Sequence, residues 1–212
     1  ASVLIAISEI EEAEKNTNMA FDLLTEEPDL NLLLNAYTRA GDIALNKNHL
    51  TAAMTAFSTA FDLAKQTKNE KDIEMCRKNI GFVHYRSKRH TEALDCYQQN
   101  LAYAQRVGDK RSLAEALANI ATIQSEKGLQ QAAITSNEQV IIIAQELGAP
   151  HVVALCKGNL ASIYYEIGQT EKAIECHNES IKILKALQMK EHIIIMLIQQ
   201  SSFMLGMIEA DR

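Results

Sequence analysis

A 40-residue internal repeat constrains this 212-residue chain more than any other feature. One column of the repeat holds only alanine, at Ala13, Ala53, Ala93, Ala133 and Ala173. A second column holds only small residues, at Gly41, Gly81, Ala121 and Ala161. Two helices can approach closely only where one side chain is Ala or Gly, and large apolar residues fill the grooves beside it. Each period therefore predicts a pair of packed helices.

Turn residues place the ends of these helices. Gly128 and Gly168 lie where the first helix of a pair should stop, and Gly108 and Gly148 lie where the second should stop. Glycine is favoured just past a helix end, and Pro150 suits the first turn of the next helix. The predicted helices span residues 10–25, 29–46, 50–67, 70–87, 90–107, 110–127, 130–147, 150–167, 170–187 and 190–210.

The repeat predicts an all-α solenoid of antiparallel helix pairs that forms a single domain over residues 1–212. The composition agrees, because 47% hydrophobic residues with 2 Pro and 8 Gly provide a continuous core and few helix breakers. The expected repeats are 1–28 (partial), 29–68, 69–108, 109–148, 149–188 and 189–212 (partial).

Two strings of the chain resemble the tetratricopeptide repeat (TPR) motif: NIGFVHYRSKRHTEALDCYQQNLAYA and NLASIYYEIGQTEKAIECHNESIKIL. The unit here is 40 residues, against about 34 in the typical family member. It is similar to the longer-repeat subgroup that includes the spindle-orientation adaptor with Leu-Gly-Asn repeats and the solenoid domain of the bacterial maltose regulator. The first full repeat departs from the motif, since Ala44 and Asn48 replace the usual aromatic and Gly. The resemblance implies a right-handed superhelical solenoid that binds other proteins.

The first helix of each pair is expected to line the concave face of the superhelix. Residues two positions before the small-residue column lie about 160° away from it around the helix, toward this groove. They are Arg39, Asn79, Asn119, Asn159 and Gln199. An Asn amide both donates to and accepts from a peptide backbone, whatever the side chains of the peptide. The family resemblance implies the same backbone-holding role for Asn79, Asn119 and Asn159.

Other predicted groove positions surround this polar ladder. They are Lys78, Phe82, Tyr85, Arg86, Thr122, Ser162 and Tyr165. In an alternative reading, each ladder Asn bonds to the adjacent repeat and only fixes the packing. Lys78, Arg86 and Arg39 either clamp a ligand carboxylate, as chaperone-binding family members do, or lie on a solvated helix face. Tyr85 and Tyr165 either stack on a ligand or seal the groove between helices.

Motifs for catalysis, cofactors and metals are absent from the sequence. It has no GxGxxG, phosphate-loop, GxSxG or HExxH pattern, and its six histidines form no zinc-type cluster with cysteine. The four cysteines form no CxxC pair and are expected to be reduced and buried in a cytoplasmic protein; they are Cys76, Cys96, Cys156 and Cys176. We therefore expect a protein that is not an enzyme, with no catalytic residues, cofactor or metal.

Charge and hydropathy narrow the range of partners. A net charge of -6 and a pI near 5.6 argue against nucleic acid, because nucleic-acid binders display a concentrated basic face. No stretch approaches the roughly 18 uninterrupted apolar residues of a membrane span, so a membrane partner is not expected either. The C-terminal stretch HIIIMLIQQSSFMLGMI is apolar on nearly all sides, which predicts that it is covered. This stretch would pack against a following repeat, against a second copy of the chain, or into the groove of its own chain. The first two alternatives are favoured.

The leading functional prediction is an adaptor-type scaffold that binds a peptide or helix of a partner protein in its concave groove. The alternative is a ligand-sensing or peptide-sensing regulatory domain of a larger signalling or transcription protein. Such a sensor needs a DNA-binding or enzymatic domain outside these 212 residues. The sequence does not name the partner, because repeat folds bind many ligands on one architecture.

Overall fold

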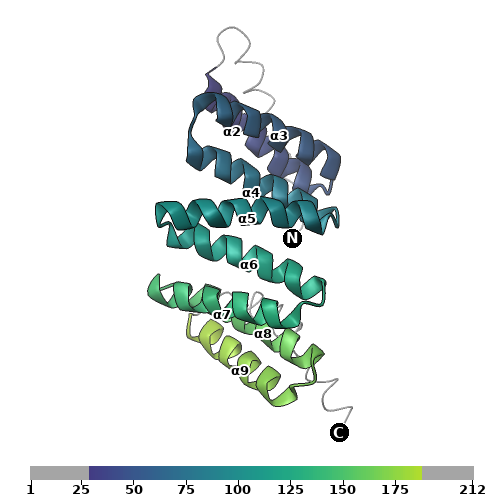
Figure 1. Ribbon diagram of the computed structural model, residues 1–212, viewed down its shortest axis with the longest axis vertical. Coiled ribbons are helices and arrows are strands. Elements are labelled where there is room, and N and C mark those ends of the chain that lie inside the picture. The colour runs from purple at the N-terminus through teal and green to yellow at the C-terminus, as the bar shows by residue number, and fades with distance from the viewer. Residues whose placement is uncertain (1–28, 188–212) are drawn as a thin grey trace, which may run out of the picture. The chain divides into compact units, whose positions relative to one another are not determined.

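The computed structural model describes residues 29–187, which form helices joined by short turns, with no strand among these residues (Figure 1). The helices are α2 (Leu30–Asn46), α3 (Leu50–Thr67), α4 (Glu70–Arg86), α5 (His90–Val107), α6 (Lys110–Glu126), α7 (Gln130–Glu146), α8 (Pro150–Glu166) and α9 (Thr170–Ala186). The predicted helices between residues 29 and 187 are confirmed to within one residue at each end. The helices predicted at 10–25 and 190–210 lie outside the described residues.

The chain divides into two compact units, residues 1–100 and 101–212, with the boundary inside α5. In the first unit α2 packs on α3 and α3 packs on α4. In the second unit α6 packs on α7, α7 on α8 and α8 on α9. Consecutive helices thus pack as the repeat predicts, and the all-α, TPR-like fold class is confirmed.

The first helix of each pair begins at a position that recurs every 40 residues. Asp29, Asn69 and Asp109 each accept a hydrogen bond at their side chain from a backbone N–H of the following first turn. This satisfies donors that have no partner within the helix. Ala149 has no such side chain, and there Pro150 occupies the start of α8 instead. Proline removes one of the unpaired donors, so the helix still begins at the same place.

Helix ends recur every 20 residues, because the residue just beyond the helix adopts a left-handed backbone conformation. These residues are Asn48, Lys68 and Lys88 in the first unit, and Gly108, Gly128, Gly148 and Gly168 in the second. The glycines confirm the predicted stops, since φ is between 61° and 76° at all four. Asn48, with φ of 58°, adopts the conformation of the glycine that it replaces in the motif.

Close helix contacts in the first unit depend on glycine. A Cβ atom on Gly41 would lie 2.5 Å from the ring of Phe57, which is fully buried. A Cβ atom on Gly81 would lie 2.9 Å from Cβ of Cys96 and 3.0 Å from the ring of Tyr97. Real Cβ atoms do not approach neighbours this closely, so each ring packs against bare backbone. The predicted close approach at the small-residue column is confirmed here.

The second unit places smaller, polar residues where the first has these rings. Asn137 and His177 lie 40 and 80 residues after Tyr97 and are 1% and 6% exposed. The Asn137 side-chain N–H donates to the Ala133 carbonyl at 2.8 Å. Within the described part of the chain, Asn137 Oδ1 and His177 Nε2 are buried without a hydrogen-bond partner. Burial lowers the pKa of His177, so the imidazole is neutral at pH 7.

All four cysteines are free thiols. Cys76, Cys156 and Cys176 are buried as predicted, but Cys96 is only half-buried. Neighbouring side chains on a helix point about 100° apart, so Tyr97 faces the core and Cys96 lies on the flank. Burial raises the pKa of Cys76 and of Cys156 to about 11, which keeps both thiols protonated and unreactive at neutral pH.

Candidate functional site

The predicted polar ladder lies on the first helices of the pairs. Asn79 on α4 and Asn119 on α6 are half-buried, whereas Arg39 on α2 and Asn159 on α8 are exposed. Gln199 lies outside the described residues. In each unit these side chains lie apart from the small-residue column, because Gly81 contacts α5 while Asn79 reaches the surface.

The amides of Asn79, Asn119 and Asn159 make no hydrogen bond with any residue that the structure describes. Asn100 on α5 behaves differently. Its amide donates to the Glu74 carbonyl at 2.8 Å and to the Glu74 carboxylate at 2.9 Å. A packing role for asparagine therefore exists in this protein, but on a second helix. Nothing among the described residues ties the ladder amides to a neighbouring repeat.

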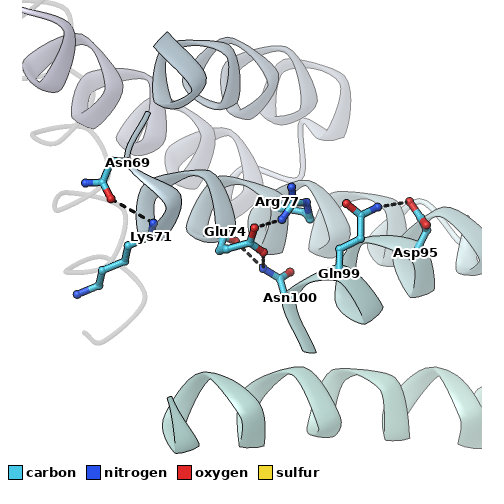
Figure 2. Close-up of polar contacts among 7 residues, drawn as sticks. All are labelled: Asn69, Lys71, Glu74, Arg77, Asp95, Gln99 and Asn100. Carbon is cyan, nitrogen blue, oxygen red and sulfur yellow. Dashed lines mark hydrogen bonds and ion pairs between the residues drawn. The ribbon is translucent and has the colours of Figure 1, made fainter. Parts of the chain in front are cut away.

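Asn100 belongs to a polar cluster in the first unit that the sequence analysis missed. The Glu74 carboxylate accepts hydrogen bonds from Arg77 on the same helix and from Asn100 on α5 (Figure 2). The side chains of Arg77 and Glu74 are only 18% and 14% exposed, and the Arg77 guanidinium lies 5.6 Å from the Phe61 ring centroid. The one available signal was Asn100 itself, a polar residue in a column that contains Ala60 and Val140.

Aromatic and cationic side chains gather at the end of α4. Phe82 is 37% exposed, and its ring centroid lies 6.2 Å from that of Tyr85. Arg86 lies over the Phe82 ring at 5.9 Å, and Lys88 over the Tyr85 ring at 5.8 Å. Helix geometry brings Phe82, Tyr85 and Arg86 together, since residues three and four apart share a face. We call Phe82, Tyr85, Arg86 and Lys88 the α4 patch.

Three cations were predicted to clamp a ligand carboxylate, at Arg39, Lys78 and Arg86. Arg86 donates to the Asn48 side chain at 2.9 Å, in the turn that follows α2. Lys78 is half-buried on α4, and Arg39 is exposed on α2. The structure thus brings Arg86 toward a turn and toward Phe82, and the carboxylate clamp stays a prediction.

The corresponding surface of the second unit has a different chemistry. Thr122 and Ser162 are exposed, and their hydroxyls donate to carbonyls of their own helices at 3.0 and 3.4 Å. Tyr165 is half-buried. Leu155, one helical turn before Asn159, is 48% exposed and was not predicted. Its spacing of four residues from Asn159 is the signal that would have found it.

Residues 29–187 contain no grouping typical of a metal centre or of a membrane span. No set of three His, Cys, Asp or Glu side chains in that range is arranged to hold a metal ion. In the same range, no helix combines the length and apolar character needed to cross a bilayer.

Comparisons with known proteins agree with this geometry. The sequence matches the family described as tetratricopeptide repeat over residues 74–146, and again over 34–67 and 156–183. Together these ranges cover more than half of the chain. A search of curated proteins gives no match.

Several solved structures share the fold at low sequence identity. BtubC (BKLC) from P. vanneervenii has a TM-score of 0.70 and 17% identity, over 86% of this chain and 74% of that one. A putative kinesin light chain from Podosopora anserina with TPR-like repeats has a TM-score of 0.65 and 16% identity, over 85% and 87%. The Rap conjugation gene regulator of plasmid pLS20, solved with the Phr* peptide, has a TM-score of 0.72 and 15% identity, over 85% and 49%.

Proposed function

Because this chain belongs to the tetratricopeptide repeat family, we propose that it is a protein-interaction scaffold that binds a partner segment on its first helices. In each unit the ladder residues hold the backbone of a partner segment, Asn79 in the first unit and Asn119 and Asn159 in the second. The neighbouring side chains of each unit then select its sequence. In this account the protein carries out no chemical reaction on its partner.

The observation that supports this proposal is that the ladder amides have no hydrogen-bond partner among residues 29–187. A side-chain amide that fixed repeat packing would donate to or accept from the neighbouring repeat, as the Asn100 amide does with Glu74. Asn79 and Asn119 are half-buried, so their amides have lost part of their hydration without a protein partner among the described residues. A peptide backbone would supply both a donor and an acceptor to each amide.

An extended segment suits the spacing of such a ladder. Packed helices lie about 8–10 Å apart and an extended chain advances about 3.3 Å per residue. Within one unit, an extended segment that crosses successive first helices would therefore meet a ladder residue every few residues of its own length. The Rap regulator of plasmid pLS20, which shares the fold, was solved with the Phr* peptide, and this supports a peptide as the ligand class.

Capture from cell extract tests the proposal. The triple variant Asn79→Ala, Asn119→Ala, Asn159→Ala is compared with the wild type and with a control, Gln98→Ala, Gln139→Ala, Asn178→Ala. The control removes three exposed amides from second helices. Circular dichroism first establishes that all three proteins are equally helical. We expect the wild type and the control to retain the same partner and the ladder variant to lose it. Equal capture by all three would contradict the proposal.

The sensing alternative is favoured by one observation, the resemblance to a gene regulator solved with a peptide. This chain spans 49% of that protein, so an effector domain would lie outside the residues compared. A sensor must change conformation when it binds, because a ligand shifts only an equilibrium between states that it binds differently. Small-angle X-ray scattering with and without the captured partner's peptide separates the two: a scaffold keeps its dimensions and a sensor changes them.

A further inference from the structure

The contact between α8 and α9 contains a histidine in the core of the second unit. His177 on α9 is 6% exposed and occupies the repeat position of Phe57 and Tyr97. Since Tyr97 faces Gly81 on the first helix of its pair, the repeat places His177 against Ala161 of α8. Histidine is the side chain whose ordinary pKa lies between pH 5 and 8. This helix contact therefore contains a group that can become charged near neutral pH.

The imidazole has no acceptor ready for a second proton. Nε2 of His177 is buried and has no hydrogen-bond partner among residues 29–187. Protonation places an N–H on both ring nitrogens, so the Nε2–H of the charged form would be unsatisfied. The α8 residues Leu160, Ala161 and Ile163 belong to the core of this unit and carry only apolar side chains. A buried charge and a buried donor without an acceptor both cost free energy.

Charged side chains around α9 lie on its flank, near Cys176, and not against His177. The titratable groups there are Lys157 and Tyr164 on α8, Glu138 on α7, and Glu175 and Glu179 on α9. Neighbouring side chains on a helix point about 100° apart, so His177 faces elsewhere. Burial alone lowers the pKa of His177. An imidazolium at this position would therefore have no carboxylate beside it among the described residues.

His84 of the first unit shows what a less buried histidine has available. It is half-buried on α4, so part of the ring keeps its contact with water. Burial and Arg89 lower the pKa of His84, and Glu92 raises it. A protonated His84 thus has both a carboxylate nearby and water, and it can be accommodated without moving a helix. His177 has neither.

We propose that α9 is an acid-released helix: when His177 takes up a proton, α9 leaves α8 while α6, α7 and α8 stay folded. Few polar contacts oppose this release. The Ser180 hydroxyl donates to the Ala154 carbonyl at 2.7 Å, and Lys157 pairs with the exposed Glu179 at 2.6 Å. Exposed ion pairs contribute little to stability. Because α9 packs on α8 at the end of the described chain, its release leaves the contacts of α7 with α6 and α8 in place.

The direction of the effect with pH follows from proton linkage. In the released state His177 is in water and has its ordinary pKa of 6.5, whereas in the packed state burial lowers the pKa. Released α9 therefore binds more protons than packed α9 once the pH falls below 6.5. The equilibrium constant for release rises by up to about tenfold per pH unit, until the pH reaches the pKa of packed His177.

Release of α9 would also affect the binding surface, because α8 carries Asn159. Without α9, the apolar side of α8 is uncovered and the helix loses a neighbour that holds it in place. A partner segment bound at Asn159 would then dissociate in acid. This consequence rests on the proposed function, whereas the release of α9 does not.

Hydrogen exchange of the full chain, followed by mass spectrometry from pH 7.5 to pH 5, tests the inference. Each rate is corrected for the pH dependence of the chemical exchange step. The proteins compared are the wild type, His177→Asn, which introduces the residue found at 137, and a control, His151→Asn, which removes an exposed histidine from α8. We expect the opening constant of α9 amides to rise, by up to about fivefold between pH 6.5 and 5.5, in the wild type and the control. The rise should be absent in His177→Asn, and α6 amides should not change in any of the three.

Three results would overturn the inference. The first is exchange of wild-type α9 amides that does not depend on pH after the correction. The second is a rise that persists in His177→Asn, which would assign the acid sensitivity to another group. The third is a simultaneous loss of protection from α6 to α9, which would mean that acid unfolds the unit and does not release one helix. His177→Gln replaces His177→Asn if that variant does not fold. The measurement uses no partner, so its result is independent of the proposed function.

Discussion

The two units build the same helix pair with glycine in different places. The first unit has Gly41 and Gly81 between helices, against Phe57 and Tyr97, and non-glycine residues at its left-handed turn positions. The second unit has alanine at the helix contact, and glycine in each left-handed turn that the structure describes. The residue opposite the small position explains the helix contact. A buried ring needs bare backbone, whereas Asn137 and His177 leave room for a methyl group.

We expect the largest difference in stability between the units when one helical glycine of each is replaced by alanine. Gly41→Ala adds a Cβ atom 2.5 Å from the Phe57 ring, so we expect the free energy of unfolding to fall by about 3 kcal/mol. Among the described residues, a Cβ atom on Gly158 in α8 would meet only Ser180 Oγ, at 3.8 Å. We expect Gly158→Ala to raise the free energy of unfolding by about 1 kcal/mol, because alanine is the better helix former. Urea denaturation measures both. Equal effects would show that the ring does not make the first glycine necessary.

Each unit has a polar residue at the same repeat position, Asn100 in the first and Ser180 in the second. Asn100 donates to the carbonyl and carboxylate of Glu74, and Ser180 donates to the Ala154 carbonyl at 2.7 Å. Asn100→Ala should lower the free energy of unfolding by about 2 kcal/mol, since one of its acceptors is charged. Ser180→Ala should lower it by about 1 kcal/mol. A larger loss from Ser180→Ala, measured by the same denaturation, would contradict the importance of the Glu74 cluster.

Exchanging the residue types of the left-handed turns between the two units should have a smaller effect on stability. Lys68→Gly relieves a left-handed conformation in a residue with a Cβ, so we expect a gain of about 1 kcal/mol in stability. Gly128→Ala should cost about 1 kcal/mol, although a Cβ there meets no atom within 4 Å. Thermal melts of the two variants check the prediction. A stable Gly128→Ala protein would mean that the turn relaxes to another conformation.

Lowering the pH should produce the smallest difference in stability, through protonation of His177 in the second unit. Burial lowers its pKa below 6.5 in the folded state, so the unfolded state binds more protons as the pH falls past that value. The contribution to stability is complete above pH 6.5 and decreases below it. His177→Asn introduces the residue found at 137 and should make unfolding less dependent on pH from 7 down to 5. An unchanged pH profile would show that His177 is not held neutral.

The periodicity of the sequence was sufficient to predict the helices and the positions at which they pack closely together. The spacing of 40 identified Gly41 and Gly81 as contact points, because close packing limits residue size wherever it occurs. The left-handed turns at Lys68 and Lys88 could not be predicted from residue type, since both residues are exposed lysines. Only their positions in the 20-residue spacing, 40 and 20 residues before the turn glycine Gly108, indicate the conformation.

For the candidate residues, the sequence predicted their places on the helices but not their contacts. Helix geometry placed Asn79 on the face away from Gly81, yet residue identity does not reveal whether an amide already has a partner. Asn100 shows this limit, because an identical side chain on α5 is used for packing. The hydrogen bond from Arg86 to Asn48 was missed because the two residues are 38 apart in the sequence and meet only in the fold.

Site-specific photo-crosslinking tests most directly whether the first helices of the pairs bind the partner. A photoreactive phenylalanine analogue replaces Phe82 or Ser162 on first helices, or Gln98 or Gln139 on second helices; all four positions are exposed. The account predicts that illumination in cell extract attaches the same partner protein at Phe82 and Ser162 and not at Gln98 or Gln139. Adducts that form only from the second helices would contradict it and move the binding surface to the opposite helices of each pair.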